Sequence, residues 1–197
     1  AAEVVVALLI AATVLLEGKM RAPLFETDAL GALVILFATF VGLAAAIHSV
    51  GHLREEARKK IIGFRRIRQY FVLFHLFFLA MFLAAATSIP LITWVAIEAT
   101  TLATAFLISF YNKPSAIEAG WKQLIINSVG LLLGFLGTLL FLNAAAGAGV
   151  TEALISWDTL YAVRDSLDPL LVTIAFIFVI VGYGTKVGFV PMHPWLP

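Results

Sequence analysis

The chain has 197 residues, of which 62% are hydrophobic and 13% are charged, and its mean hydropathy is +1.03. Soluble domains carry about 25% charged residues, so this composition excludes an ordinary soluble domain and indicates an integral membrane protein. The net charge of +1 provides no global field for nucleic acid. Because there is no cysteine, these residues cannot form a disulfide, a thiolate-bound iron–sulfur cluster or a thioether haem link.

Six apolar segments follow one another along the chain, and we predict that each forms a membrane helix. Their approximate bounds are residues 1–16, 29–47, 70–88, 89–111, 119–146 and 169–190. We therefore predict an all-α fold, a polytopic transmembrane helix bundle that forms one transmembrane domain over residues 1–197. Because the chain begins without Met in an apolar run and ends just after several prolines, we expect it to be a fragment of a longer protein.

The loops between these segments predict the orientation of the chain. Residues 54–68 carry the strongest positive charge, in Arg54, Arg58, Lys59, Lys60, Arg65, Arg66 and Arg68. If each segment crosses once, this loop and the loop with Lys113 share one side, while the acidic loop 151–168 lies on the other. By the positive-inside rule the basic loops are cytoplasmic. Isoleucines between the arginines favour an amphipathic surface helix at residues 54–68 rather than a nucleic-acid site.

Glu98 lies near the centre of the fourth segment. A charged residue at that depth costs roughly 2.5–3.5 kcal/mol on insertion scales, so it is rarely incidental. Thr101 is three residues further on and shares the same helix face. The structural alternative is a carboxyl that only fixes helix packing, but we predict a functional role.

Lys186 is the most informative residue of the chain. It ends a long apolar run and stands among Gly182, Gly184 and Gly188, just before three prolines. Glycines alone could mark a close helix contact. A cation beside glycines and prolines at membrane depth also matches the discontinuous helices that bind ions in transporters. We therefore predict a helix break near Lys186 and an ion-handling role for its amine.

Three further residues have weaker signals. Lys122 begins the fifth segment and could simply extend to the membrane interface, whereas Asn127 and Ser128 would line a wetted path if Lys122 faces inward. His193 follows the predicted break and could relay protons, because its unperturbed pKa is near neutral, or cap a turn. His75 lies among apolar residues and could be only a hydrogen-bonded histidine.

Four stretches of sequence resemble one known family. They are residues 94–102 (WVAIEATTL), 119–124 (AGWKQL) with 127–130 (NSVG), 184–197 (GTKVGFVPMHPWLP) and 28–32 (DALGA). The set resembles the antiporter-like membrane subunits of respiratory complex I, of multisubunit cation/proton antiporters and of membrane-bound nickel–iron hydrogenases. Residues 97–103 look most like the formate hydrogenlyase and energy-converting hydrogenase branch. The resemblance covers nearly the whole chain.

The resemblance implies roles for particular residues. In this family a glutamate of the fifth helix and a lysine of the sixth modulate a proton-carrying lysine on the broken seventh helix. By motif these residues are Glu98, Lys122 and Lys186, and His193 matches the histidine of the loop after the break. Glu98, paired with Lys122 or Lys186, would set which state binds the proton. The chain would be the N-terminal part of the subunit and end inside the first of two inverted repeats.

The function implied is proton translocation by the antiporter-like subunit of a redox-driven complex, most similar to a membrane-bound hydrogenase or formate hydrogenlyase-like complex. A sodium/proton antiporter subunit and a non-transporting membrane anchor of a multisubunit complex stay open as alternatives. We expect no cofactor, no metal and no redox chemistry on this chain. The expected partners are other membrane and peripheral subunits, the lipid bilayer and protons, or sodium, but no nucleic acid. The expected location is the inner (plasma) membrane of a prokaryote, crossed several times.

Overall fold

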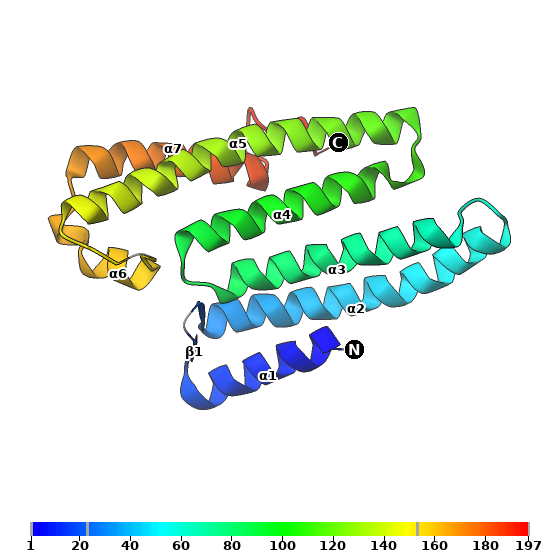
Figure 1. Cartoon of the computed structure of the whole chain (residues 1–197), viewed down its shortest axis with the longest axis horizontal. Coiled ribbons are helices and arrows are strands. Elements are labelled where there is room, and N and C mark those ends of the chain that lie inside the picture. Colours follow the sequence, from blue (N-terminus) through cyan, green and yellow to red (C-terminus); the bar gives the residue numbers. More distant parts are fainter. Residues whose placement is uncertain (1, 23, 153, 197) are drawn as a thin grey trace. The chain divides into compact units, whose positions relative to one another are not determined.

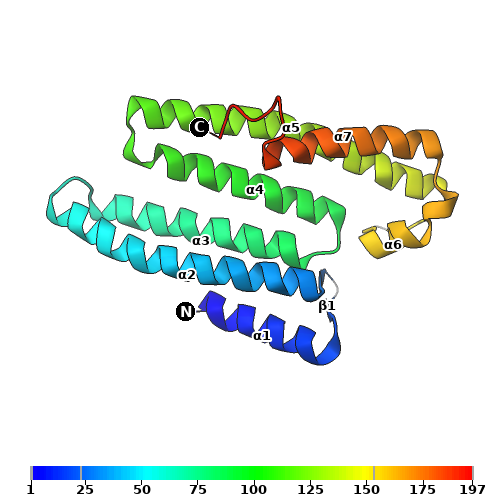
Figure 2. The same cartoon turned by 180° about the vertical axis from the view of Figure 1, so that it is seen from behind.

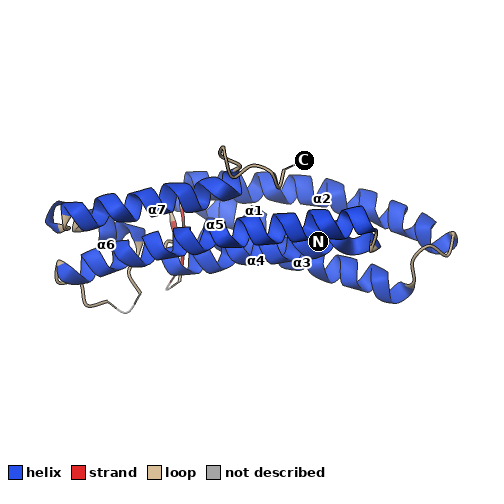
Figure 3. Cartoon of the chain, turned by 90° about the horizontal axis from the view of Figure 1, so that it is seen from above, coloured by secondary structure: helices blue, strands red, loops and turns tan. Residues whose placement is uncertain are grey.

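The computed structural model describes residues 2–22, 24–152 and 154–196. Nearly all of the regular structure is helical, which confirms the all-α prediction (Figure 3). The helices are α1 (Ala2–Glu17), α2 (Ala29–Arg58), α3 (Phe64–Ala86), α4 (Pro90–Ile108), α5 (Pro114–Gly147), α6 (Trp157–Ala162) and α7 (Pro169–Val187). Two short 3-10 helices, η1 (Ser109–Tyr111) and η2 (Arg164–Ser166), and two strands, β1 (Met20–Ala22) and β2 (Phe25–Thr27), complete the elements.

Five of the described helices are long and apolar enough to cross a membrane, namely α2, α3, α4 with η1, α5 and α7. The protein is therefore a multi-pass membrane protein. Each of the six predicted segments overlaps one helix, and the segment at residues 1–16 corresponds to α1, which has 16 residues. The described residues fall into two compact units, Ala1–Thr87 and Ser88–Pro197, which are treated separately below. The single transmembrane domain predicted over residues 1–197 stays a prediction.

In the first unit, α2 packs against both α1 and α3 (Figures 1 and 2). A small core joins the three helices through Ala7, Ile35 and Ala86. Gly42 of α2 lies directly against the Phe78 ring of α3, so that any side chain at position 42 would overlap the ring. Near the other end of this helix pair, the hydroxyls of Ser49 and Tyr70 are hydrogen-bonded at 2.7 Å.

A short antiparallel hairpin, β1–β2, connects α1 to α2. The Glu26 carboxylate accepts hydrogen bonds from Lys19 Nζ and Arg21 Nε, each at 3.2 Å. Partial burial raises the pKa of Glu26, but the hydrogen bonds and positive charges of Lys19 and Arg21 outweigh it and hold the pKa below its usual value. Asp28 then caps α2, because its Oδ1 accepts the Gly31 amide at 2.8 Å.

The basic stretch at residues 54–68 is mostly helical, and the expected separate surface helix does not form. Helix α2 continues to Arg58 and α3 begins at Phe64, so only residues 59–63 form the loop. Pairs such as Arg58–Glu55, at 2.8 Å, favour helix between residues three or four apart. The apolar pattern therefore marked the hydrophobic part of each helix and not its polar end.

In the second unit, α5 is central and packs against both α4 and α7 (Figure 1). The α5–α7 contact is close because small residues face each other. Gly134 lies against Gly182, and a side chain at Gly130 would overlap Thr185. On the other side, Trp94 Nε1 of α4 donates to the Leu131 carbonyl oxygen of α5 at 2.7 Å. These contacts hold α4 and α7 against α5, and the polar residues described below lie between the helices.

Candidate functional site

Helix α7 ends one residue after Lys186, as predicted. Gly188 adopts a left-handed conformation with φ of +89°, which a residue with a Cβ rarely adopts. The Phe189 and Gly188 amides donate to the carbonyls of Gly184 at 2.9 Å and Thr185 at 3.1 Å, which is the Schellman pattern of helix ends. The residues that follow, as far as Leu196, form turns. Lys186 consequently lies in the last turn of α7, where the helix dipole favours a cation.

The Lys186 side chain reaches from α7 to α4. Its Nζ donates a hydrogen bond to Thr101 Oγ1 at 2.9 Å. The Thr101 hydroxyl is itself directed at the Ile97 carbonyl oxygen, at 3.3 Å, so its hydrogen is engaged and its oxygen accepts from the amine. Thr101 is fully buried and Lys186 is partly buried. The lysine is therefore held between two helices by a neutral hydroxyl.

Glu98 lies on the same face of α4 as Thr101, one turn from the hydroxyl that accepts the Lys186 hydrogen bond. Ser128 Oγ of α5 donates to Glu98 Oε1 at 2.7 Å. The second carboxyl oxygen, Oε2, is buried and has no hydrogen-bond partner among the described residues. It is available to take a proton or to accept a further hydrogen bond. The structure thus brings together an acid and a base from α4 and α7, with Thr101 and Ser128 as their direct partners.

Lys122 is not part of this arrangement. Its side chain is 59% exposed on α5 and forms an ion pair with Glu118, four residues earlier, at 2.6 Å. Lys122 precedes Ser128 by six residues, a rise of about 9 Å along the helix. Lys122 therefore pairs with a neighbour on its own helix. The pairing of Glu98 with Lys186 stays a prediction.

His193 lies in the turns after α7 and is exposed. Its carbonyl oxygen accepts the Leu196 amide at 3.0 Å, and no described residue forms a hydrogen bond with its ring. The turns fold back on α7, because Trp195 Nε1 donates to the Thr185 carbonyl oxygen at 3.0 Å. His193 is therefore close in sequence to the end of α7, but its relay role stays a prediction.

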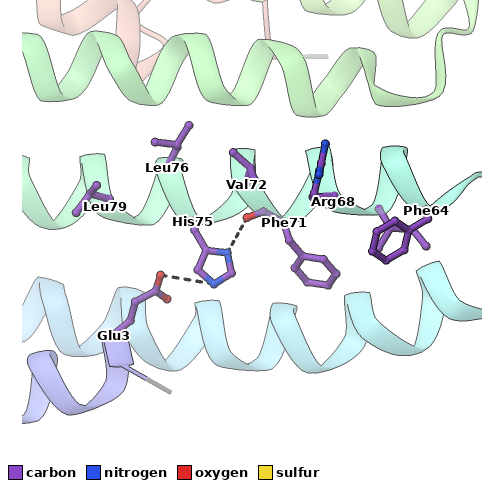
Figure 4. A pocket seen from close by; sticks show the side chains of 9 residues that line it. Glu3, Phe64, Arg68, Phe71, Val72, His75, Leu76 and Leu79 are labelled. Atoms are coloured by element: carbon purple, nitrogen blue, oxygen red, sulfur yellow. Dashed lines mark hydrogen bonds and ion pairs between the residues drawn. The ribbon is translucent and has the colours of Figure 1, made fainter.

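His75 belongs to the first unit, on α3 (Figure 4). Its Nδ1 is 2.6 Å from the Phe71 carbonyl oxygen and its Nε2 is 3.9 Å from Glu3 Oε1. Both side chains border an open apolar groove of about 680 Å³. In the part of the chain that the structure describes, no group of three or more His, Cys, Asp or Glu side chains could hold a metal ion.

Two further polar side chains of α5 are buried in the second unit, and the sequence did not single out one of them, Gln123. Gln123 Nε2 of α5 donates to Thr104 Oγ1 of α4 at 2.8 Å, and Gln123 is 4% exposed. Asn127, whose wetted-path role was linked to Lys122, is fully buried and donates to the Gln123 carbonyl oxygen at 2.9 Å. Their four-residue spacing in an otherwise apolar helix was the available signal.

Comparisons with known proteins find a matching family and several relatives. Residues 91–197, more than half of the chain, match the family described as "NADH:quinone oxidoreductase/Mrp antiporter, TM". The chain is 34% identical over 174 residues to a hydrogenase-4 component F homolog of Methylacidiphilum infernorum, covering 88% of this chain and 37% of that protein. It is 28% identical over 180 residues to NADH-quinone oxidoreductase subunit L of Neisseria meningitidis, covering 88% of this chain and 26% of that protein.

A solved structure shares the fold. It is that of the membrane-bound sulfane sulfur reductase, an archaeal respiratory membrane complex, with a TM-score of 0.74 and 20% identity. The match covers 98% of this chain and 39% of the other. The chain therefore spans between about a quarter and two fifths of the length of these relatives.

Proposed function

Because the chain belongs to the NADH:quinone oxidoreductase/Mrp antiporter family of membrane subunits, we propose that it forms part of a proton-translocating subunit of a redox-driven complex. The similarity to a hydrogenase-4 component F homolog favours a membrane-bound hydrogenase or formate hydrogenlyase-like complex. Redox cofactors would then reside on partner subunits, both membrane-embedded and peripheral. The corresponding location is the inner membrane of a prokaryote.

One observation carries this proposal: among the described residues, the Lys186 amine donates to the Thr101 hydroxyl of α4, and the Glu98 carboxyl, one turn from Thr101, accepts from the Ser128 hydroxyl of α5. A lysine in a close ion pair holds its proton more tightly, because the opposite charge favours the ammonium form. A lysine that donates to a neutral hydroxyl can lose its proton without leaving an opposite charge unpaired beside it.

The mechanism follows from electrostatics. Two unit charges even about 8 Å apart interact by about 2 kcal/mol at an effective dielectric constant of 20, and about 1.4 kcal/mol changes a proton affinity tenfold. Protonation or movement of Glu98 therefore changes how tightly Lys186 holds its proton. Lys186 would take up a proton while Glu98 is ionised and release it when Glu98 is neutralised. No large backbone movement is needed for this exchange.

The test is proton flux in inverted membrane vesicles that contain the full-length complex. Lys186→Ala and Glu98→Gln should abolish flux while redox turnover and assembly persist. Lys113→Ala is the control, because Lys113 is exposed at the start of α5 and should leave flux unchanged. Normal flux in both site variants would exclude the proposal.

Sodium/proton antiport is a second candidate, because the matched family includes Mrp antiporters. Vesicles given a sodium gradient but no electron donor separate the two. Antiport predicts proton movement that follows the sodium gradient, whereas redox-driven translocation predicts none until the electron donor is added.

A further inference from the structure

Three buried oxygen atoms of the second unit have no hydrogen-bond partner among the described residues. They are Glu98 Oε2, Gln123 Oε1 and Asn127 Oδ1. Each belongs to a side chain on α4 or α5. Since buried polar atoms in folded proteins are nearly always paired, three lone acceptors along one helix contact need donors other than the described residues, such as water.

The hydrogen bonds around them fix which amide atoms are the lone acceptors. Thr104 Oγ1 is directed at the Thr100 carbonyl oxygen at 2.8 Å, so its hydrogen is used and it accepts from the Gln123 NH₂ group. The Asn127 NH₂ group donates to the Gln123 carbonyl oxygen. In both amides the atom without a partner is therefore the carbonyl oxygen, Gln123 Oε1 or Asn127 Oδ1. A carbonyl oxygen accepts hydrogen bonds and cannot donate them.

The same contacts place the acceptors in a row. Helices α4 and α5 run antiparallel, with Thr104 opposite Gln123 and Glu98 opposite Ser128. Asn127 is one turn beyond Gln123, about 6 Å along the helix, and so lies level with the segment of α4 between Glu98 and Thr104. Thr101, the partner of Lys186, is in that segment. A file of acceptors spaced by helical turns suits a chain of waters better than one ion, which needs its ligands around a single point.

The row begins at an open pocket. This pocket has a volume of about 330 Å³ and is lined by residues at the end of α4 and the start of α5, among them Ala105, Ser109, Asn112, Gly120 and Leu124. Ala105 directly follows Thr104, and Leu124 directly follows Gln123. The pocket thus lies one residue from the Thr104–Gln123 pair on each helix, although neither side chain of the pair lines it.

We propose that Gln123 and Asn127 line a hydrated entry path that carries protons from this pocket along the α4–α5 contact to Lys186. This inference rests on the proposed function and adds the route to it. The amides do not carry the proton; they accept hydrogen bonds from water and keep the waters in line. A hydronium next to Lys186 passes one proton to the neutral amine and becomes water, so that the transfer is balanced.

Cysteine accessibility tests the path independently of proton flux. The 197 residues contain no cysteine, so a thiol introduced here is the only one in these peptides. Gln123→Cys and Asn127→Cys, in the full-length protein within its complex, are exposed to a small water-soluble thiosulfonate, and labelling is followed by mass spectrometry of these peptides. Asn112→Cys at the pocket is the positive control. Leu131→Cys is the matched negative control, because Leu131 is as fully buried as Asn127, one turn further along α5.

The path predicts labelling at positions 123 and 127 within about tenfold of the rate at 112, and at least a hundredfold faster than at 131. Rates at 123 and 127 as low as at 131 would overturn it. In that case the proposed function would still stand if Lys186→Ala abolishes flux. Conversely, fast labelling at positions 123 and 127 together with normal flux in Lys186→Ala would support the hydrated path and contradict the proposed function.

A second pair of variants serves if the cysteine proteins do not assemble. Gln123→Leu removes the acceptor at similar volume, whereas Gln123→Glu keeps an acceptor oxygen. We expect the leucine variant to lose at least tenfold in proton flux, with redox turnover retained, and the glutamate variant to restore most of it. Equal flux in the leucine variant and the unmodified protein contradicts the path.

Discussion

At the scale of single residues, Thr101 is the direct partner of the Lys186 amine. It shares a face of α4 with Glu98, and its hydroxyl oxygen accepts the hydrogen bond from Lys186 Nζ at 2.9 Å. A hydroxyl stabilises the ammonium without adding a negative charge, so it raises the proton affinity of Lys186 less than a carboxylate in direct contact would. In this account the hydroxyl decides how strongly the lysine responds to Glu98.

Replacement of Thr101 by valine removes this hydroxyl at nearly constant volume. A hydrogen bond to a charged group contributes about 1.5–3 kcal/mol, so Thr101→Val should lower proton flux by about tenfold or more and move the pH profile of flux. Thr93→Val is the control, because the Thr93 hydroxyl bonds only to the Ile89 carbonyl oxygen of its own helix. Equal pH profiles in the two variants would mean that Thr101 does not tune Lys186.

The sequence indicated some of these residues and not others, for a physical reason. Glu98 and Lys186 are charges inside apolar runs, which is costly wherever they point, so their roles could be predicted from position alone. Which lysine meets Glu98 depends on how α4, α5 and α7 are rotated against one another. The sequence left Lys122 and Lys186 open. Gln123 could not be predicted, because a neutral amide in an apolar helix indicates a role only once its partner on α4, Thr104, is known.

At the scale of helices, close glycine contacts position the site. The contacts of Gly134 with Gly182 and of Gly130 with Thr185 bring α5 and α7 together one turn from Lys186. The backbone itself forms this contact, so neither helix can yield as a flexible side chain would. The helix pair therefore sets the distance over which Lys186 must reach to α4.

Alanine substitution at two glycines distinguishes this contact from a general effect of glycine in helices. Gly182→Ala would overlap the Gly134 backbone and should destabilise the protein by about 1–3 kcal/mol or more, as overpacking does. Gly51→Ala, on α2, meets nothing within 4 Å and should stabilise by about 0.5–1 kcal/mol. Thermal unfolding of the purified complex measures both. A similar midpoint for the two variants would show that the α5–α7 contact is not tight.

Helix ends were predicted less well than helix centres. Hydropathy gave residues 29–47, whereas α2 extends to Arg58 through a polar stretch that pairs with itself. In contrast, the end of α7 was visible in advance because Gly188 and Pro191 each have a strong local effect on the backbone. Glycine and proline therefore located an end that polarity alone would have missed.

At the scale of the whole molecule, five described helices suited to crossing a membrane and a family match over residues 91–197 identify a multi-pass membrane protein of this family. Its helices hold a partly buried acid and a partly buried base, and three acceptors without a partner among the described residues, within one compact unit, Ser88–Pro197. A membrane anchor would need neither. The account depends on Lys186 exchanging its proton rather than only being positive.

Lys186→Arg separates these two properties most directly. Arginine keeps the positive charge and the capacity to donate to Thr101 but does not release its proton in proteins. Proton flux is measured during redox turnover in vesicles that contain the full-length complex. The account predicts that Lys186→Arg assembles and turns over electrons while moving no protons. Flux equal to that of the unmodified protein would show that Lys186 acts only as a fixed charge and would contradict the account.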